Sequence, residues 1–330
     1  METIWLALLG LLLTGYFVLG GYDYGVQMLH GPLARDEHER RLALNSFGPF
    51  LLGNEVWLVA FAGVLIGAFP HFEAALLSSL FLPVSAIVGG VVLGSVAVQL
   101  RSRHTGHAAR GVWGALALAG GLVAAAGWGL VTGLLLRGLP ARTAGGVTFE
   151  VGLADLLDPF VLVCAATAVA LFAGHGAAFI AMRTRDGLRR RAARAGRPLL
   201  AAAALGTVAA AAVGAASGLA AGGVLMTALA AALPGVLACA VYALARQAPR
   251  WAFAATSCAA ALPVPIIGFG LYPNVLAVAG GEGGMTVAEA AADAATLRLL
   301  FPVAVLTIPL VLAFQAMGWW AFRGRAATYL

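Results

Sequence analysis

Nine long apolar segments, separated by short polar stretches, constrain this chain more than any other feature of its sequence. A helix of about 20 apolar residues spans the hydrocarbon core of a bilayer, because each residue advances the helix by about 1.5 Å. Composition agrees, since 62% of the 330 residues are hydrophobic and 10% are charged. We therefore expect an all-α polytopic membrane protein with about nine transmembrane helices. The predicted spans are roughly residues 4–29, 50–69, 74–100, 112–136, 159–182, 199–219, 224–245, 251–271 and 299–321.

The helix count suggests an arrangement as two four-helix bundles plus one peripheral helix. No composition shift marks a separate soluble domain, so residues 1–330 are predicted to form a single transmembrane domain. The first apolar segment lacks a preceding basic region and a cleavage site of small residues. We therefore interpret it as the first membrane helix and not as a removed signal peptide.

The arginines predict the orientation in the membrane. All 20 basic residues are arginine, and all but three (Arg137, Arg142 and Arg298) lie in alternate connections between spans or in the tail. The chain is expected to lie in a bacterial cell membrane. The positive-inside rule then places its N-terminus outside the cell and its C-terminus in the cytoplasm. Basic patches at this position suit anionic membrane lipids, so a nucleic-acid partner is not expected.

Two acidic residues fall inside the predicted spans at similar depth. Asp23 lies roughly 19 residues, or about 28 Å, into the first span, near its cytoplasmic end. Asn54 and Glu55 lie near the cytoplasmic start of the second span, which runs the other way. Protonatable groups within a membrane often form proton relays, so a cytoplasmic proton path is one interpretation. Glu55 could instead extend to the membrane interface or cap its helix. Either acid could also pair with an arginine of the adjacent loop, for instance Arg40 or Arg101, and only stabilise the helix bundle.

Other polar residues favour structural roles. His175 lies within a span, where it could ligate a haem, but no second His or Met is placed to complete a site, so hydrogen-bonded packing is the default. Asp158 precedes Pro159, which is typical of an N-cap followed by proline at the first helical position. No metal-ligand spacing, phosphate-binding loop or nucleophile motif is present. We expect no metal site, no cofactor-binding residue and no catalytic residue in this chain.

Several segments together resemble a known family. They are GGYDYGVQML (20–29), ERRLALNSFGPFLLGNEVWLV (39–59), GAFP (67–70), LLDPF (156–160), HGA (175–177), MTVAEAAADAATLRLL (285–300) and FRGR (322–325). In order and spacing they are similar to subunit II of the cytochrome bd family of quinol oxidases, across nearly the whole length. The NEVW and GYDYG blocks carry the resemblance most specifically.

The resemblance implies a function that this chain performs only in a complex. Subunit II of that family is a haem-free, nine-helix companion of subunit I, with which it forms a pseudo-symmetric heterodimer. Subunit I carries the haems b and d and the quinol site, and the complex oxidises membrane quinol with O2, making water. The resemblance also allows for a small accessory single-helix subunit. It implies proton-path roles for Asp23, Asn54 and Glu55 and a packing or O2-route role for Trp57, while His175, Asp158 and Arg101 are candidates for structural polar residues.

This chain departs from the family pattern at three places. Most members have W-D-G-N at residues 51–54, so the acid usually invoked for proton conduction is Leu52 here. The family's R-x-x-x-x-[DE]-[FY]-R becomes Gly94, Gln99, Leu100 and Arg101, and Asp158 replaces an Asn. Either proton uptake uses Asp23 and Glu55, or subunit I supplies the protons alone.

A proton-coupled secondary transporter is the alternative, because buried acids and glycine-rich helices also suit that class. Such a transporter should have helices broken near the membrane midplane and a substrate pocket. The acids of this chain cluster toward one membrane face, and no paired Gly- or Pro-interrupted spans are evident. The sequence therefore favours the oxidase subunit.

Overall fold

The computed structural model describes residues 1–330 except 105, 143–147, 220–222, 281–282 and 325–330. Arg325, which was predicted to lie in the cytoplasmic tail, is thus outside the described residues, and so is the side chain of Arg142. The helices are α1 (Glu2–Leu33), α2 (Glu37–Phe47), α3 (Leu51–Ala68), α4 (Pro70–Ser79), α5 (Phe81–Arg103), α6 (His107–Arg137), α7 (Leu153–Leu156), α8 (Pro159–Arg183), α9 (Asp186–Ala216), α10 (Val224–Ala245), α11 (Pro249–Ala261), α12 (Pro263–Leu271), α13 (Val287–Ala290) and α14 (Ala294–Ala321). The strands are β1 (Ala141–Arg142), β2 (Thr148–Phe149), β3 (Asn274–Ala277) and β4 (Gly284–Thr286).

The predicted span count is confirmed within the described residues. Nine helical segments there are long and apolar enough to cross a membrane, with α11 and α12 together forming one of them. The span predicted at 224–245 has the bounds of α10. Helix α9 begins at Asp186, well before the predicted residue 199, so most of the arginine-rich connection is helical. Arginine is a good helix former, which explains this extension.

Two predicted spans are interrupted. The span predicted at 74–100 is divided at Leu80, where α4 ends and α5 begins, with Pro83 in the first turn of α5. The span predicted at 251–271 is interrupted at Leu262, just before Pro263 and Pro265. Proline has no backbone N–H and its ring clashes with the preceding turn, so it starts a helix more readily than it continues one.

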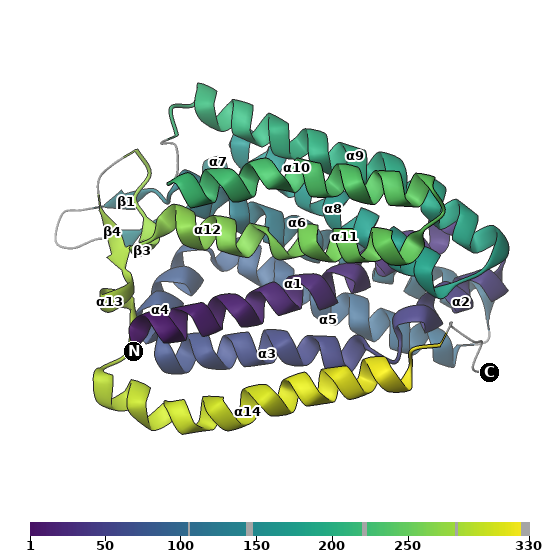
Figure 1. The fold of residues 1–330 in the computed structure, drawn as a ribbon, viewed down its shortest axis with the longest axis horizontal. Coiled ribbons are helices and arrows are strands. Elements are labelled where there is room, and N and C mark those ends of the chain that lie inside the picture. Colours follow the sequence, from purple (N-terminus) through teal and green to yellow (C-terminus); the bar gives the residue numbers. More distant parts are fainter. Residues whose placement is uncertain (105, 143–147, 220–222, 281–282, 325–330) are drawn as a thin grey trace.

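Helices α1 and α8 form the centre of the bundle. In Figure 1, α1 runs between α11 and α12 on one side and α3 on the other. The two central helices approach closely where Gly25 faces Gly176, and a Cβ atom on Gly176 would lie 2.6 Å from the nitrogen of Val26. Small residues at such crossings let membrane helices pack backbone against backbone.

Helix α14 is peripheral. It lies along α3 at the lower edge of Figure 1, and only 6% of its most apolar window is buried, against 61% for α8. This agrees with the predicted peripheral helix. Because α1 and α8 contact helices on both sides of the bundle, no boundary between two four-helix bundles is evident, and that division stays a prediction.

The two ends of the bundle differ in charge. Short hairpins β1–β2 and β3–β4 cover one end, where Leu139 pairs with Val278. The opposite end holds α2, the turns α5–α6, α8–α9 and α10–α11, and the C-terminal end of α14. We call this the basic end, because the described arginines other than Arg137, Arg142 and Arg298 lie there.

Candidate functional site

The predicted Asp23 and Asn54 lie in direct contact in the interior of the bundle. The Asn54 Nδ2 atom donates to the Asp23 carboxylate at 3.0 Å and lies 2.8 Å from the hydroxyl of Tyr22. Asp23 is 3% exposed and Asn54 is fully buried. Asp23 near the end of α1 and Asn54 near the start of α3 therefore share one depth, on the side of the basic end.

Helix α14 closes this contact from outside. The Gln315 side chain donates to Asn54 Oδ1 at 3.2 Å, and its Oε1 accepts from Trp57 Nε1 at 3.4 Å. The Trp57 ring covers Gly15 of α1, where a Cβ atom would clash with it. Sequence reasoning missed Gln315, because one amide in a long apolar span gives no sign of which helix it faces.

Glu55 turns away from this contact toward α5. It is half-buried, and Ser95 donates a hydrogen bond to its carboxylate. Neither Glu55 nor Asp23 forms an ion pair with a described arginine. The alternative in which these acids pair with Arg40 or Arg101 is therefore wrong, because both arginines bind Glu37 instead.

Three polar side chains of α1 form a stripe, and only one of them, Asp23, was predicted from the sequence. Asp23, Gln27 and His30 are spaced by four and three residues, so they lie on one helix face, and each is at most 3% exposed. The His30 Nδ1 atom is 2.8 Å from the Gln27 carbonyl oxygen. We call these three residues the α1 polar stripe. Their spacing was visible in the sequence and could have identified Gln27 and His30.

The α1 polar stripe carries two buried oxygens without a hydrogen-bond partner among the described residues. They are Oδ1 of Asp23 and Oε1 of Gln27. Buried polar atoms are nearly always satisfied by protein or by ordered water, so each such exception calls for an explanation. The two oxygens lie on successive turns of α1, and buried polar atoms of this kind are usually satisfied by ordered water.

Gln27 explains one departure from the family pattern. A Cβ atom on Gly94 of α5 would lie 2.9 Å from Cδ of Gln27, so the Gln27 amide fills the space beside this glycine. An arginine side chain at residue 94 does not fit while Gln27 holds this position. Gly94 and Gln27 are therefore sterically complementary in this chain.

The α1 polar stripe leads to a cavity of about 280 Å³ at the basic end. Its titratable and charged lining residues are His30, Glu37, Arg40, Arg101, His107 and Arg110. Glu37 is the sole carboxylate among them and binds Arg101 at 2.7 Å and Arg110 at 3.7 Å. Burial favours a higher pKa for Glu37, but the Arg101 hydrogen bond and the charges of Arg101 and Arg110 outweigh it and hold the pKa below its usual value.

His175 is hydrogen-bonded on both sides of its ring. Its Nε2 lies 2.9 Å from the carbonyl of Val18 and its Nδ1 lies 2.7 Å from the hydroxyl of Thr256. The ring stacks on Phe253 at 5.1 Å with an angle of 4°. Both nitrogens are thus engaged, and neither is free to bind a haem iron.

Asp158 lies at the start of α8. Its carboxylate accepts from the backbone N–H of Phe160 at 2.9 Å and binds Arg137 at 3.2 Å. Leu52 and Gln99, the two departures at which the family has acids, are both exposed. Neither belongs to the α1 polar stripe. Within the described chain, no three His, Cys, Asp or Glu side chains gather closely enough to hold a metal ion.

Comparison with known proteins gives a consistent result. A family model described as "Cytochrome bd terminal oxidase subunit II" matches residues 1–322. The "Cytochrome bd ubiquinol oxidase subunit 2" of Bacillus subtilis (strain 168) is 27% identical over 99% of this chain and 97% of that relative. The "Cytochrome bd-I ubiquinol oxidase subunit 2" of Escherichia coli (strain K12) is 28% identical over 98% of this chain and 95% of that relative. A chain of the bd oxidase structure from Geobacillus thermodenitrificans superposes with a TM-score of 0.75 at 16% identity, covering 98% of this chain and 99% of that one, which shows a shared fold.

Proposed function

This chain belongs to the cytochrome bd terminal oxidase subunit II family, and from that premise we propose that it is the haem-free subunit of a heterodimer that oxidises membrane quinol and reduces O2 to water. The haem-bearing subunit I is its partner, and quinol is the substrate of the complex. The hydrogen bonds at both ring nitrogens of His175 argue against haem ligation by this residue. The matched family is an oxidase family, so the transporter alternative is not retained.

In the proposed orientation the basic end faces the cytoplasm and the N-terminus lies outside. The distribution of arginines supports this orientation, since cytoplasmic connections of membrane proteins carry an excess of Lys and Arg. Oxygen reduction consumes protons, which in this family come from the cytoplasm. The cavity lined by His30 and Glu37 then opens on the side from which those protons are taken.

The proposed proton path follows the α1 polar stripe, from the cavity past His30 and Gln27 to Asp23. The observation that carries this proposal is the pair of buried, unpartnered oxygens on Gln27 and Asp23. In this path Asp23 takes up and releases the proton, and Asn54 holds its carboxylate in place. Glu55, whose carboxylate points toward α5, serves as a second proton-carrying group.

The path does not require an acid at residue 52. Leu52 is 68% exposed on the outer face of α3, away from the α1 polar stripe. A proton moving from the cavity to Asp23 stays inside this chain. We infer that proton uptake through this subunit is retained although Leu52 and Gln99 replace two acids of the family pattern.

Trp57 belongs to a proposed O2 route. An apolar cavity of about 260 Å³ lies between α1, α3 and α14, and Trp5, Trp57 and Leu300 are among its lining residues. A small apolar molecule such as O2 partitions into an apolar space more readily than into water. The cavity therefore suits an O2 route that stays separate from the α1 polar stripe.

Purification of the complex in mild detergent tests the proposed function. We expect this chain to co-purify with a haem-bearing subunit and the preparation to consume O2 when quinol is added. Omitting quinol, or expressing this chain without its partner, provides the controls. A colourless protein that purifies alone under the same conditions, without quinol-dependent O2 uptake, would contradict the proposal.

A further inference from the structure

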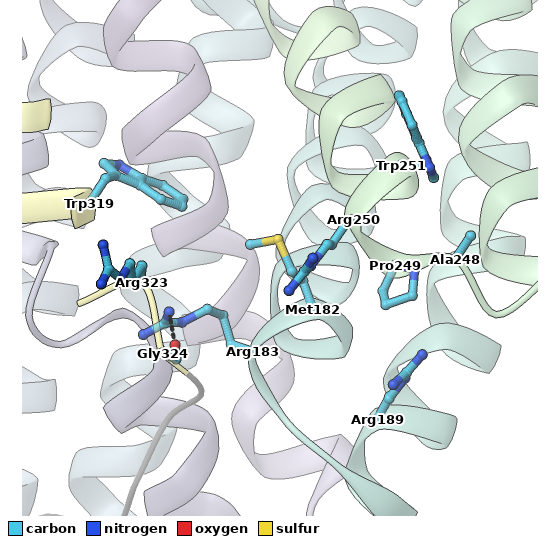
Figure 2. Close-up of a pocket in the computed structure, with 10 residues that line it drawn as sticks. All are labelled: Met182, Arg183, Arg189, Ala248, Pro249, Arg250, Trp251, Trp319, Arg323 and Gly324. Carbon is cyan, nitrogen blue, oxygen red and sulfur yellow. Dashed lines mark hydrogen bonds between the residues drawn. The ribbon is translucent and has the colours of Figure 1, made fainter. Parts of the chain in front are cut away.

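A second cavity at the basic end is lined mainly by arginine and tryptophan. It has a volume of about 410 Å³ and lies between the end of α8, the start of α9, the α10–α11 turn and the end of α14. Its lining residues include Arg183, Arg189, Arg250, Arg323, Trp251 and Trp319. Figure 2 shows Arg183 and Arg323 on the side of α14, and Arg189 and Arg250 on the side of α9 and α11. The volume falls within the range of about 300–1,000 Å³ that is usual for ligand sites.

The cavity has more positive charge than the described chain neutralises. Arg189, Arg250 and Arg323 form no ion pair with a described carboxylate. Arg189 donates to the backbone carbonyl of Gln247 at 3.0 Å, which holds it at the cavity wall. Arg183 donates to the carbonyl of Phe322 at 2.6 Å and thereby fixes the end of α14. Several guanidinium groups lining one cavity indicate a site for an anion with several oxygens, such as a phosphate.

An apolar hollow continues from this cavity. It has a volume of about 440 Å³ and lies between α10 and α11, where its lining includes Cys239, Tyr242, Ala254 and Cys258. Ala248 and Trp251 line both spaces, so the arginine-lined cavity and the apolar hollow adjoin. Helices α10 and α11 both belong to membrane spans. The apolar part therefore lies at the depth of lipid acyl chains, and the arginines lie at the level of headgroups.

We propose that this double cavity binds one anionic phospholipid, with the phosphate held among Arg189, Arg250 and Arg323 and an acyl chain in the hollow between α10 and α11. Basic residues at the membrane surface attract anionic headgroups, and tryptophan prefers the same interfacial level. A free phosphate would leave the apolar hollow without an occupant, and a zwitterionic lipid would leave the positive charge uncompensated. The site depends on the chain crossing a membrane but not on the proposed proton path.

Lipid titration of the delipidated complex, followed by native mass spectrometry, tests the charge requirement. We expect phosphatidylglycerol to bind more tightly than phosphatidylcholine with the same acyl chains. The double substitution Arg250→Gln and Arg323→Gln should weaken phosphatidylglycerol binding about 30-fold, the effect of two basic residues at an anionic headgroup. Arg190→Gln with Arg194→Gln removes the same charge from exposed positions of α9 outside the cavity and should have little effect.

A second variant tests the acyl-chain part and distinguishes a lipid from a free anion. Ala254→Trp should fill the exposed hollow and weaken phosphatidylglycerol binding, whereas Ala209→Trp on the exposed face of α9 should not. Inorganic phosphate at millimolar concentration should not displace the lipid. Equal binding of both lipids, equal effects of the two arginine pairs, or displacement by inorganic phosphate with no effect of Ala254→Trp would overturn the proposal. The quinol oxidase activity of the variants is measured alongside, so that failure of the lipid site and failure of the proposed function remain distinguishable.

Discussion

Buried polar groups on the two faces of α1 differ in how fully they are hydrogen-bonded. On the α8 face, the ring nitrogens of His175 contact the Val18 carbonyl and the Thr256 hydroxyl, and the glycines 25 and 176 bring the backbones together. On the face toward α3 and α5, Asp23 and Gln27 are equally buried, yet each keeps one oxygen without a described partner. Leaving a buried polar atom unsatisfied costs about 1–3 kcal/mol. The α8 face therefore contributes mainly to stability, whereas the face toward α3 and α5 has the polar groups that the proposed proton path requires.

The largest effect is expected from disrupting the packing of α1 against α8. In Gly176→Ala the new Cβ atom would meet the backbone of Gly25 and Val26, which cannot move without separating the two central helices. Such overpacking costs about 1–3 kcal/mol, and we expect little assembled complex in the membrane. Gly10→Ala is the matched control, because its Cβ atom meets nothing within 4 Å. Equal yields of the two variants, measured by haem content, would contradict this packing role.

Asp23→Asn tests the opposite face with the fold left intact. The amide keeps an oxygen that can accept from Asn54 but cannot carry a proton. We expect turnover to fall about 100-fold, the lower end of what a positioned proton-transfer group contributes. Quinol-dependent O2 uptake per haem measures this, with thermal unfolding as the check on stability. Normal turnover of this variant would show that Asp23 does not belong to the proton path.

His175→Ala should show the reverse pattern. Loss of the ring leaves the Thr256 hydroxyl with one partner fewer and removes the stacking on Phe253, so we expect a lower unfolding temperature, equivalent to roughly 1–3 kcal/mol. Turnover per haem should stay unchanged. His38→Ala, on the exposed side of α2, is the control and should alter neither quantity. Slow turnover with unchanged stability would show that the α8 face also serves the reaction.

Glu55→Gln should have a smaller effect on turnover than Asp23→Asn. Glu55 is only half-buried, and Ser95 can still donate to the amide oxygen of the variant. We expect O2 reduction to slow several-fold with haem content preserved. Unchanged turnover would leave Glu55 with a structural role, while a loss as large as that of Asp23→Asn would place both acids on one path.

The smallest effect is expected from restoring the family's acid. Because Leu52 lies on the exposed face of α3, Leu52→Asp adds a carboxylate outside the α1 polar stripe. Turnover should therefore stay close to that of the unmodified complex, measured by O2 uptake under saturating quinol. A marked increase would indicate that a second path, along the exposed face, limits the reaction.

The sequence predicted the helix count and a similar depth for Asp23 and Glu55, because span length, charge alternation and distance along a helix are local properties. The contact of Asp23 with Asn54, the residue before Glu55, agrees with that depth. It did not reveal Gln315, whose contact with Asn54 joins the second span to the last. A membrane helix is apolar on every side, so its sequence does not identify the buried face in the way an amphipathic pattern does. The family pattern drew attention to Leu52, whereas Gln27 and His30 were not predicted, although their spacing from Asp23 on one helix face was visible in the sequence.

The most direct test is proton uptake from the medium during a single turnover of the reduced complex with O2. A pH-indicator dye follows the protons, and haem absorbance follows the electrons. If the α1 polar stripe conducts protons, uptake in Asp23→Asn should slow together with the haem transitions that require protons, while uptake in His175→Ala keeps its normal rate. Identical uptake rates in Asp23→Asn and the unmodified complex would mean that the protons reach the haems by another route.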